Sequence, residues 1–543
     1  MLFSDDQVKA IEQLREFLLY NTEDKTILLQ GSAGTGKTSI VNHLFSLPEF
    51  SKFNVCLTAT TNKAVSVMEQ MHIKSNDKKS VKSISFATLH KLLKTKRVID
   101  NFGDPQFVVN KNNIFSKGRN KKKSTNINSY DIIVIDEVSM LSSSLFNSLM
   151  EIIDKVRGKI IFTGDKFQLN PVNEEESEVF SIPNKVILTT IHRAKNGILG
   201  ISNHIRESVE HQSKVKIRKW TDENVMLIKK SDEWINKYIE FLSNSKDPST
   251  FPIILAYTNQ RCLELNTTIR KILFKEVPNF TNSIYLPKEH IVFNNAYKHK
   301  DSQKVFHTST QEVIYSMDTS VKTTSFLTIN DLISKPVSEA EISSASDTCK
   351  VCRTEPIDED LPSSCEHKFC TTCYNSWIKL NKCCPFCTIS CKDGIFSIKK
   401  RTKLTHLINK FATICCSSYK TYLLKLSQDE LIETLHEKSR EKYNIDLKKL
   451  KDILADIKSL DNSNLTFCIL SNLWEFLYAN FIDVFADISY GYCITSHKSQ
   501  GSTYHTAFVD VGNILNFNRS VVDGLKCLYT SVTRPSNNLC IHY

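Results

Sequence analysis

A glycine-rich octapeptide near the start of the chain has the residue types that hold the phosphates of a nucleotide. It reads Gly31-Ser32-Ala33-Gly34-Thr35-Gly36-Lys37-Thr38, after an apolar run at 27–29 and before an amphipathic segment from residue 39. Glycines let backbone N–H groups close around a polyphosphate, and the following helix N-terminus adds partial positive charge. Lys37 could reach the β- and γ-phosphates, and the Thr38 hydroxyl could ligate Mg²⁺. A chance turn is the alternative, which the complete strand–loop–helix pattern disfavours.

Acidic and amide side chains follow two later apolar strands. Asp136 and Glu137 come directly after the run 131–135, and Gln168 follows the run 159–163. In P-loop hydrolases an Asp in such a place holds Mg²⁺, and an adjacent carboxylate can activate the attacking water. A surface turn is the alternative, but the octapeptide upstream favours catalysis. Gln168 is placed to sense the terminal phosphate or the water.

Eight further side chains have the spacing of a zinc module. They form four pairs: Cys349 and Cys352, Cys365 and His367, Cys370 and Cys373, Cys384 and Cys387. Thiolates with one imidazole at these spacings suit tetrahedral Zn²⁺, and eight ligands suit two ions. A module of roughly forty residues has too little hydrophobic core to fold alone, so metal binding would supply the folding free energy. Disulfides are the alternative, which the lack of a recognisable signal peptide disfavours.

Each of several other residues has two interpretations, one functional and one structural. Gln7, in the first turn of an expected helix, could read an adenine edge or be a solvated helix residue. Phe86 and His90 could contact nucleic acid, although Phe86 suits the core equally well. The basic run 117–123 is a solvated loop or a phosphate-contacting one. Arg534 is a surface residue or an arginine finger that acts on a phosphate bound to the first domain.

The elements that must position these residues alternate between strand and helix. A length of 543 residues predicts several domains, and 41% hydrophobic and 24% charged residues are ordinary for globular protein. The formal charge of 70 − 59 = +11 suits a polyanionic partner. The longest apolar stretch, 467–486, contains polar residues, so we expect a buried helix and no membrane span. The alternation predicts an α/β fold.

Taken in order, the motifs resemble those of superfamily 1 helicases, and specifically the RecD/Dda-like 5′-to-3′ branch. The matching segments are Gln7, 31–38, 57–64, 136–140, 164–168, 188–193, 256–259, 497–501 and 529–534. The resemblance implies two RecA-like P-loop domains with parallel sheets and ATP in the cleft between them. It implies a small β-hairpin insertion in the first domain, with a hairpin near 97–109 that separates strands, and a β/α insertion carrying the zinc module in the second.

With this resemblance the expected division of the chain has five parts. They are the P-loop ATPase domain at 1–245 with a hairpin insertion at 94–129, the second RecA-like domain at 246–275 and 486–543, a small SH3-like β insertion and linker at 276–345, the zinc module at 346–395, and a helical insertion at 396–485.

The resemblance also implies roles for single residues. Lys37 would bind phosphate, Thr38 and Asp136 would hold Mg²⁺, and Glu137 would be the catalytic base. Gln168 would couple the γ-phosphate to DNA contacts, with Arg193 and Arg534 as arginine fingers. Gln7, the octapeptide and Gly501 would bind ATP. The candidates for DNA contact are Thr60, Phe86, His90 and His497.

The zinc module resembles a RING finger. That family pairs its ligands in an interleaved way, which puts Cys349, Cys352, Cys370 and Cys373 on one ion and Cys365, His367, Cys384 and Cys387 on the other. RING fingers commonly recruit a ubiquitin-conjugating enzyme, and Val351, Trp377 and Pro385 stand where that family places contact residues. Thr388 departs from the basic residue common in active ligases, so a structural or partner-docking module is supported as well as a ligase.

The expected function is an ATP-dependent DNA helicase that translocates on single-stranded DNA and unwinds duplex, with the RING insertion serving partner docking or ubiquitin transfer. A ubiquitin ligase that its ATPase locates on nucleic acid is the alternative. The intact set of Lys37, Asp136, Glu137, Gln168 and Arg534 disfavours a third reading, a binding module with a decayed ATPase. We expect a soluble, intracellular monomer in cytoplasm or nucleus. The Asn- and Lys-rich composition with a RING insertion hints at a large DNA virus of eukaryotes, and so at a host cell.

Overall fold

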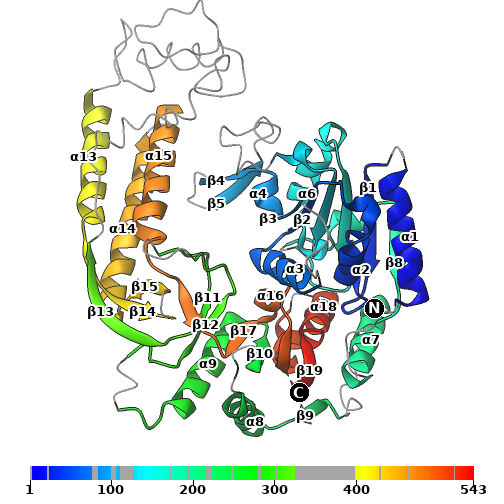
Figure 1. The fold of residues 1–543 in the computed structure, drawn as a ribbon. Coiled ribbons are helices and arrows are strands. Elements are labelled where there is room, and N and C mark those ends of the chain that lie inside the picture. The colour runs from blue at the N-terminus through cyan, green and yellow to red at the C-terminus, as the bar shows by residue number, and fades with distance from the viewer. Residues whose placement is uncertain are drawn as a thin grey trace, which may run out of the picture.

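Two parallel sheets lie next to each other and carry the sequence motifs at their carboxyl ends (Figure 1). The computed structural model describes residues 3–543 apart from 21–23, 76–82, 100–104, 110–125, 172, 192–195, 214, 216–222, 246, 248–249, 279–282, 300–303, 324–397, 427–429, 461–463 and 519. We call each sheet with its covering helices a lobe. The α/β fold class with two parallel sheets is confirmed.

The sheet of the first lobe has the strand order β3-β2-β6-β7-β1-β8, with every pair parallel. The strands are β1 Thr26–Gly31, β2 Val55–Ala59, β3 Ile84–Thr88, β6 Ile132–Asp136, β7 Lys159–Gly164 and β8 Lys185–Leu188. Most of their residues are buried, as apolar runs in a sheet covered on both faces should be. The central strands β6, β7 and β1 end in the candidate nucleotide motifs, and β2 and β3 end in the candidate DNA motifs.

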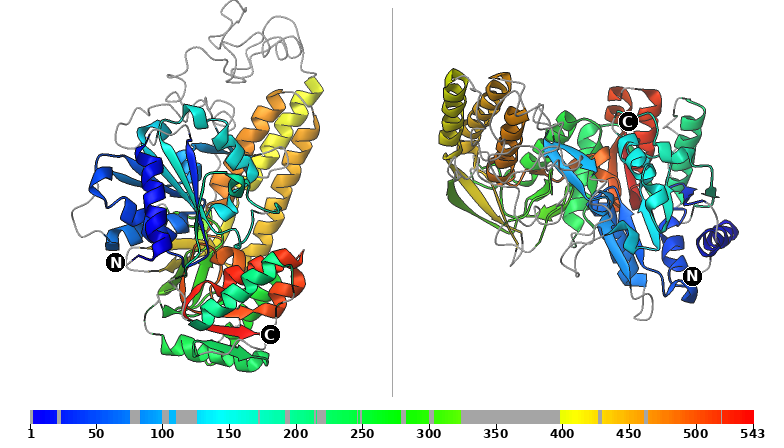
Figure 2. Two further views of the ribbon diagram at one scale, coloured as in Figure 1. Left: turned by 90° about the vertical axis from the view of Figure 1, so that its right-hand side faces the viewer. Right: turned by 90° about the horizontal axis from the view of Figure 1, so that it is seen from above.

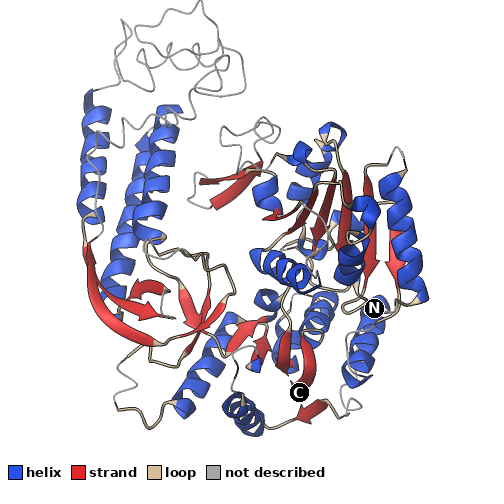
Figure 3. Ribbon diagram, in the orientation of Figure 1, coloured by secondary structure: helices blue, strands red, loops and turns tan. Residues whose placement is uncertain are grey.

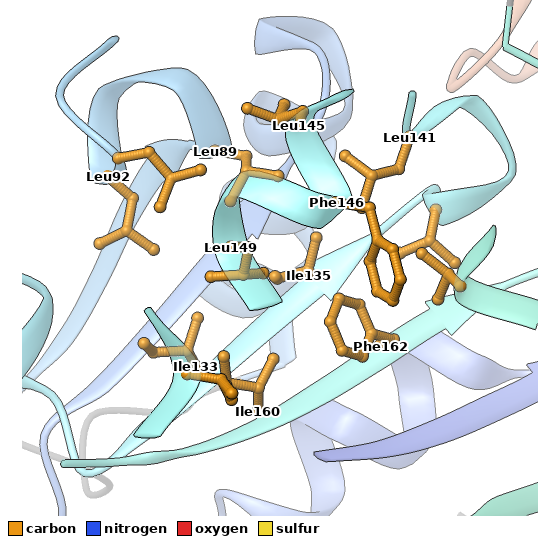
Figure 4. Packing of buried hydrophobic residues seen from close by; sticks show 14 of the residues in the cluster. Leu89, Leu92, Ile133, Ile135, Leu141, Leu145, Phe146, Leu149, Ile160 and Phe162 are labelled. Atoms are coloured by element: carbon orange, nitrogen blue, oxygen red, sulfur yellow. The ribbon is translucent and has the colours of Figure 1, made fainter. Parts of the chain in front are cut away.

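Helices cover both faces of this sheet. One face packs against α1 Asp5–Leu19, α2 Lys37–Leu44 and α3 Asn62–Ser75. The other packs against α4 Leu89–Leu92 and α6 Ser143–Met150, where Leu145, Phe146 and Leu149 meet Ile135 and Phe162 from the strands (Figure 4). Because successive strand side chains point to opposite faces, Ile133 and Ile135 serve one core and Val134 serves the other.

The sheet of the second lobe has the order β17-β10-β18-β19-β9, also fully parallel. Its strands are β9 Val225–Ile228, β10 Ile253–Ala256, β17 Cys493–Thr495, β18 Tyr504–Asp510 and β19 Pro535–His542. Helices α7 Asn196–Glu210, α17 Val511–Phe517 and α18 Val521–Val532 cover one face, and α8 Ser231–Asn244 and α9 Asn259–Leu273 cover the other.

The strand β9 corrects the expected end of the first domain at residue 245. It pairs with β19, and α7 packs on α18, so both belong to the second lobe. The chain therefore passes to the second lobe before residue 196. Pairing with β19 and packing on α18 determine to which lobe β9 and α7 belong. Local sequence does not reveal such tertiary contacts.

Two small antiparallel sheets follow α9. The first, β12-β11-β16, contains β11 His290–Phe293, β12 Gln311–Val313 and β16 Ile488–Tyr490, and the second, β13-β14-β15, contains β13 Ser316–Thr323, β14 Ser418–Lys425 and β15 Leu431–Leu435. Two expectations are thereby corrected. The insertion at 396–485 is not wholly helical, because β14 and β15 lie within it. Strand β16 belongs to a β insertion and not to the second parallel sheet.

Three helices form an arm that stands away from the second sheet (Figures 1 and 2). They are α13 Ile398–Cys415, α14 Glu437–Leu460 and α15 Asn464–Leu477, packed around a shared apolar core, and a π-helical turn, η9 Tyr478–Ile482, follows α15. Helix α15 contacts strand β4 Thr95–Ile99 of the first lobe. With β5 Pro105–Val109, β4 forms the expected antiparallel hairpin.

The remaining elements are short. They are the 3₁₀ turns η1 Pro48–Phe50, η2 Ile127–Ser129, η3 Val138–Met140, η4 Ile153–Lys155 and η5 Glu178–Ser181, and the one-turn helix α16 Ser496–Ser499. Figure 3 shows how helices and strands are distributed over the described residues. Among the described residues no helix combines the length and apolar character that crossing a membrane requires.

Candidate nucleotide and nucleic-acid sites

The octapeptide forms a loop between β1 and α2 that only glycine permits. Gly34 and Gly36 have φ values of 84° and 85°, in the left-handed region. A Cβ on Gly36 would lie 2.6 Å from Nε2 of Gln7. That amide donates to the carbonyl of Thr35 at 2.9 Å, and the backbone N–H of Ser4 donates to Oε1 of Gln7 at 3.1 Å. Gln7 is buried, so its interpretation as a solvated helix residue is wrong.

Lys37 folds back over the loop that precedes it. Its Nζ donates to the carbonyls of Gly31 at 2.7 Å and Ser32 at 3.1 Å. Among the described residues it forms no ion pair with a carboxylate. Thr38 lies beside it in the first turn of α2. An ammonium group held only by carbonyl dipoles keeps its charge available to a phosphate.

Asp136 and Glu137 lie at the carboxyl end of β6. Oδ1 of Asp136 accepts from the hydroxyl of Thr163 and from the backbone N–H of Glu137 at 2.9 Å. Its Oδ2 makes no hydrogen bond with any described residue, so this oxygen and the Thr38 hydroxyl fit Mg²⁺, which prefers oxygen ligands. Glu137 has a φ of 55°, unusual for a residue with a side chain.

Burial and neighbouring charges shift the pKa of Glu137. Burial raises its pKa, and the neighbouring carboxylate of Asp136 raises it further. Arg534 and Lys37 act in the opposite direction. The two cations that lower the pKa of Glu137 thus come one from each lobe. A raised pKa suits a group that must take a proton from water, because a more basic carboxylate is the better general base.

Arg534 is buried at the lobe interface, with 5% of its surface exposed. It follows α18, and its guanidinium donates to the carbonyls of Thr530 at 2.9 Å and Ser502 at 3.2 Å. No ion pair with a described carboxylate is formed. A buried guanidinium that donates only to neutral oxygens is costly unless an anion arrives, so its interpretation as a surface residue is wrong. Arg193, the other expected arginine finger, lies outside the described residues.

Asp165 and Tyr529 close the interface over the octapeptide. Oδ2 of Asp165 accepts from the backbone N–H of Ala33 at 2.8 Å and from the hydroxyl of Tyr529 at 2.9 Å. The same N–H also lies 3.2 Å from the Tyr529 hydroxyl. Sequence reasoning did not single out either residue, although each belongs to a quoted motif. A buried acid beside a buried phenol is visible only when the lobes are placed together.

Two glutamines extend the interface. Gln168 is buried, its Nε2 lies 3.4 Å from Oδ2 of Asp165, and its Oε1 has no hydrogen-bond partner among the described residues. Gln500 of the second lobe donates from Nε2 to the hydroxyl of Ser139 at 3.0 Å, and its Oε1 is likewise without a described partner. An unpaired buried oxygen costs roughly 1–3 kcal/mol, so these amides are poised for a further ligand or water.

A second group of polar residues lies at the ends of β2 and of the first small sheet. Lys63, in the first turn of α3, donates to the carbonyl of Ser309 at 3.3 Å and lies 5.5 Å from the ring centroid of Tyr504. Gly501 has a φ of 73°, and a Cβ there would come within 3.4 Å of Ala64. The structure thus places Gly501 against α3, and its expected role in binding ATP stays a prediction.

Several hydroxyl and imidazole groups near Lys63 are buried without partners among the described residues. They are the side-chain oxygens of Thr60, Ser502 and Tyr504 and Nδ1 of His307. The expected candidate Thr60 therefore has an unused hydroxyl at the end of β2. We call Thr60, Lys63, His307, Ser502 and Tyr504 the β2-end cluster.

The other candidates for DNA contact are only partly brought together. Phe86 packs against the first-lobe core, with its ring 5.8 Å from that of His72. His90 follows β3 and lies 3.3 Å from the Thr95 hydroxyl, and burial lowers its pKa. His497 begins the motif after β17, with its ring 5.8 Å from that of Tyr257, and burial lowers its pKa too. In the described part of the chain no hydrogen bond or ring contact joins His497 to Phe86 or His90.

The eight expected zinc ligands and the basic run 117–123 lie outside the described residues. Within the described ranges no group of histidine, cysteine and acidic residues is arranged to hold a metal. Several cysteines there are buried, and Cys56 and Cys540 form no disulfide bond.

Family models match two parts of the chain. Residues 3–222 match the AAA domain family, and residues 349–387 match the zinc finger, C3HC4 type (RING finger). Over 157 residues the chain is 27% identical to the RecBCD enzyme subunit RecD of Buchnera aphidicola, covering 27% of this chain and 23% of that protein. It is 26% identical over 230 residues to the ATP-dependent DNA helicase RRM3 of Saccharomyces cerevisiae, covering 37% and 28%. These matches support a superfamily 1 helicase in which residues 3–222 are of the AAA domain family and residues 349–387 are a RING-type insertion.

This helicase is accordingly an ATP-hydrolysing enzyme of the DNA helicase class, as the motifs predicted. A relative of full length is protein R530 of Acanthamoeba polyphaga mimivirus, 29% identical over 564 residues and covering 99% of both chains, which agrees with the expected viral source. Solved structures that match the chain include the Pif1 helicase of Bacteroides with ADP-AlF3 and ssDNA (TM-score 0.43, 12% identity, covering 100% of this chain and 93% of that one) and Pif1 of Candida albicans (0.39, 14%, 100% and 94%).

Proposed function

We propose that this helicase converts ATP hydrolysis at the lobe interface into 5′-to-3′ movement along single-stranded DNA, and that it unwinds duplex ahead of it. One observation carries the proposal. The Tyr529 hydroxyl of the second lobe donates to Oδ2 of Asp165 at 2.9 Å, the same oxygen that accepts from the Ala33 N–H of the octapeptide, and Arg534 lies buried just after Tyr529 in the chain. A site that draws charges from two lobes links hydrolysis to their relative position.

The residues at this interface have different roles in the transfer of the terminal phosphoryl group to water. Lys37 and Arg534 neutralise the charge that develops on the terminal phosphate, and Glu137 takes the proton of the attacking water. Thr38 and Asp136 would hold Mg²⁺, which would supply further charge neutralisation. Arg193 is assigned a second arginine-finger role by its motif alone. Because Arg534 comes from the other lobe, hydrolysis requires the lobes to be together, and product release separates them.

The β2-end cluster is the proposed site of single-strand contact. It contains a lysine, an aromatic ring and unused hydroxyl groups, which are the components of backbone contact and base stacking. Its residues come from the first lobe, the second lobe and the small sheet, so the movement that closes the ATP site also moves this cluster. The hairpin of β4 and β5 is the proposed wedge between duplex strands, and its strand β4 contacts α15 of the helical arm.

Polarity and unwinding are tested on one set of substrates. Wild-type protein with ATP is given duplexes carrying a 5′ DNA tail, a 3′ DNA tail or an RNA tail. We expect strand separation on the 5′-tailed DNA only. Unwinding from the 3′ tail would contradict the assigned direction, and hydrolysis of ATP without unwinding on any substrate would contradict the assignment of unwinding.

For the RING insertion we propose two bound Zn²⁺ ions and a role in docking a partner. The ligand order of the segment matched by the RING family supports zinc and leaves two partner classes: a ubiquitin-conjugating enzyme, or a protein bound without ubiquitin transfer. Incubation with activating enzyme, ubiquitin and a panel of conjugating enzymes separates them. Chain formation with any member would assign a ligase, and none across the panel would assign docking alone.

The proposed setting is the interior of a host cell infected by a large DNA virus, with the protein acting as a monomer. Its relative of full length in a mimivirus supports this setting, as do buried cysteines such as Cys56 and Cys540, which form no disulfide bond. Light scattering with and without DNA tests the oligomeric state.

A further inference from the structure

Arg206 brings a third cation to the octapeptide, from an unexpected place. It lies on α7, outside every motif that the sequence indicated. Its Nη1 donates to the hydroxyl of Ser32 at 3.0 Å. Its guanidinium also lies 5.8 Å from the ring centroid of Phe167, in the segment between Asp165 and Gln168. The side chain is thus fixed between the octapeptide and the strand end that carries the buried amide Gln168.

No carboxylate among the described residues pairs with the charge of Arg206. The side chain is half-buried, and among the described residues no carboxylate forms an ion pair with it. A guanidinium has five N–H donors in a planar fork that matches a carboxylate or a phosphate. Here one of these donors makes a hydrogen bond, to the neutral hydroxyl of Ser32. A partly desolvated cation in this state gains most when an oxyanion reaches it.

Arg206 acts from the second lobe. Helix α7 packs against α18, which contains Tyr529 and leads to Arg534. The contact with Ser32 therefore crosses the same interface as the hydrogen bonds that Tyr529 makes with Asp165 and Ala33. If the lobes separate, Arg206 leaves the octapeptide together with Arg534.

The position of Ser32 indicates which part of the nucleotide Arg206 meets. The start of helix α2 lies at the other end of the loop, where its N-terminal amides serve the inner phosphates. Ser32 and Ala33 lie instead beside Asp165 and Gln168, the side on which the terminal phosphate is expected. Arg206 is therefore aimed at the outer end of a triphosphate.

We propose that Arg206 binds the γ-phosphate of ATP directly, and so makes the closed interface selective for ATP over ADP. The inference rests on the ATP site of the proposed function and adds a residue to it. In the absence of nucleotide Arg206 rests on the Ser32 hydroxyl, and it exchanges that hydroxyl for a phosphate oxygen when ATP is bound.

The test compares two affinities in the full-length protein, for a fluorescent ADP and for a fluorescent, non-hydrolysable ATP analogue. Arg206→Ala should weaken binding of the ATP analogue about tenfold or more, as expected for loss of a charge-assisted hydrogen bond, and change ADP binding less than about twofold. Arg206→Lys should lie between. The exposed neighbour on α7 provides the control Glu207→Ala, which should change neither affinity.

A purely structural role gives a different pattern. If Arg206 only holds Ser32 in place, Ser32→Ala would reproduce the altered ratio of the two affinities, whereas we expect it to leave that ratio unchanged. Equal weakening of both nucleotides by Arg206→Ala, or none, would overturn the proposal. If Arg206→Ala does not fold, Arg206→Gln serves in its place. Failure of the wild type to unwind DNA would contradict the proposed function while leaving this comparison intact.

Discussion

The hydroxyl of Tyr529 donates to Oδ2 of Asp165 at 2.9 Å, across the interface of the two lobes. The same oxygen accepts from the backbone N–H of Ala33 in the phosphate-binding loop. A carboxylate oxygen thus sits where the loop offers an N–H donor, and a phenol from the second lobe holds it there. The loop, the first-lobe strand end and the second lobe are joined at one atom.

Removing that hydroxyl should loosen the interface. Tyr529→Phe leaves a buried carboxylate with one hydrogen bond fewer, so we expect the free energy of unfolding to fall by about 1–3 kcal/mol. Equilibrium urea unfolding measures the change. Tyr315→Phe, at an exposed tyrosine, is the matched control and should have no effect. Equal stability of Tyr529→Phe and wild type would show that the bond contributes nothing.

The nucleotide and DNA sites should be separable by single lysine substitutions. Lys37→Ala removes the phosphate-binding ammonium group, so DNA-stimulated ATPase activity should vanish while binding of single-stranded DNA stays close to wild type. Filter binding and a coupled ATPase assay measure the two. Parallel loss of both activities would speak against the assignment of Lys37.

Lys63→Ala should give the opposite pattern. Loss of one phosphate contact weakens DNA binding and reduces the slope of log affinity against log salt by about 1. Basal ATP hydrolysis without DNA should change little. The exposed Lys52, on the first lobe, supplies the control Lys52→Ala, which should leave the slope as it is. An unchanged slope for Lys63→Ala would remove Lys63 from the β2-end cluster.

The pH dependence of hydrolysis should reflect the raised pKa of Glu137. A general base is active only when deprotonated, so kcat should fall on acidification with an inflection above 4.5, the ordinary pKa of a glutamate. Asp165 adds to the raised pKa through its negative charge. Asp165→Asn should therefore move the inflection to lower pH, as seen in kcat measured across pH. Asp154→Asn, at an exposed acid, should not move it, and an upward shift in Asp165→Asn would refute the electrostatic argument.

The RING insertion should need zinc, and the ATPase of the two lobes should not. Elemental analysis should give two zinc ions per chain, and Cys370→Ser should lower that number, because the thiolate is a predicted ligand. Cys416→Ser, at an exposed free cysteine, should keep both ions. ATPase activity should survive a zinc-selective chelator with Mg²⁺ in excess, since no group of three or more histidine, cysteine and acidic residues that could hold a metal occurs in the described ranges. Loss of ATPase activity when zinc alone is removed would contradict this separation.

The residues predicted best from sequence are those that follow a buried strand. Asp136 ends β6, Gln168 follows β7, and the octapeptide follows β1, so local order along the chain fixes their position on one sheet edge. Parallel strands bring their carboxyl ends to that edge whatever lies between them. The nucleotide motifs could therefore be assembled without any knowledge of tertiary structure.

What sequence did not reveal depends on how the lobes meet. Arg206 and Tyr529 gain their significance only from contacts with Ser32 and Asp165 across the interface. The strand β14 was missed for a different reason. Its alternation of exposed and buried residues, from Ser418 to Lys425, is typical of a strand, but lysines and tyrosines within it also fit an amphipathic helix.

The register of β10 and β17 has a consequence for how this enzyme could change over time. Ile254 lies beside Cys493 in a parallel pair, although the small sheets, the helical arm and the RING segment all lie between them in the chain. The point of departure and the point of return of this whole cassette are thus neighbours in one sheet. Replacement of this cassette by another of different length would leave the parallel sheet and the ATP site unaltered. The same two lobes could therefore carry different inserted domains.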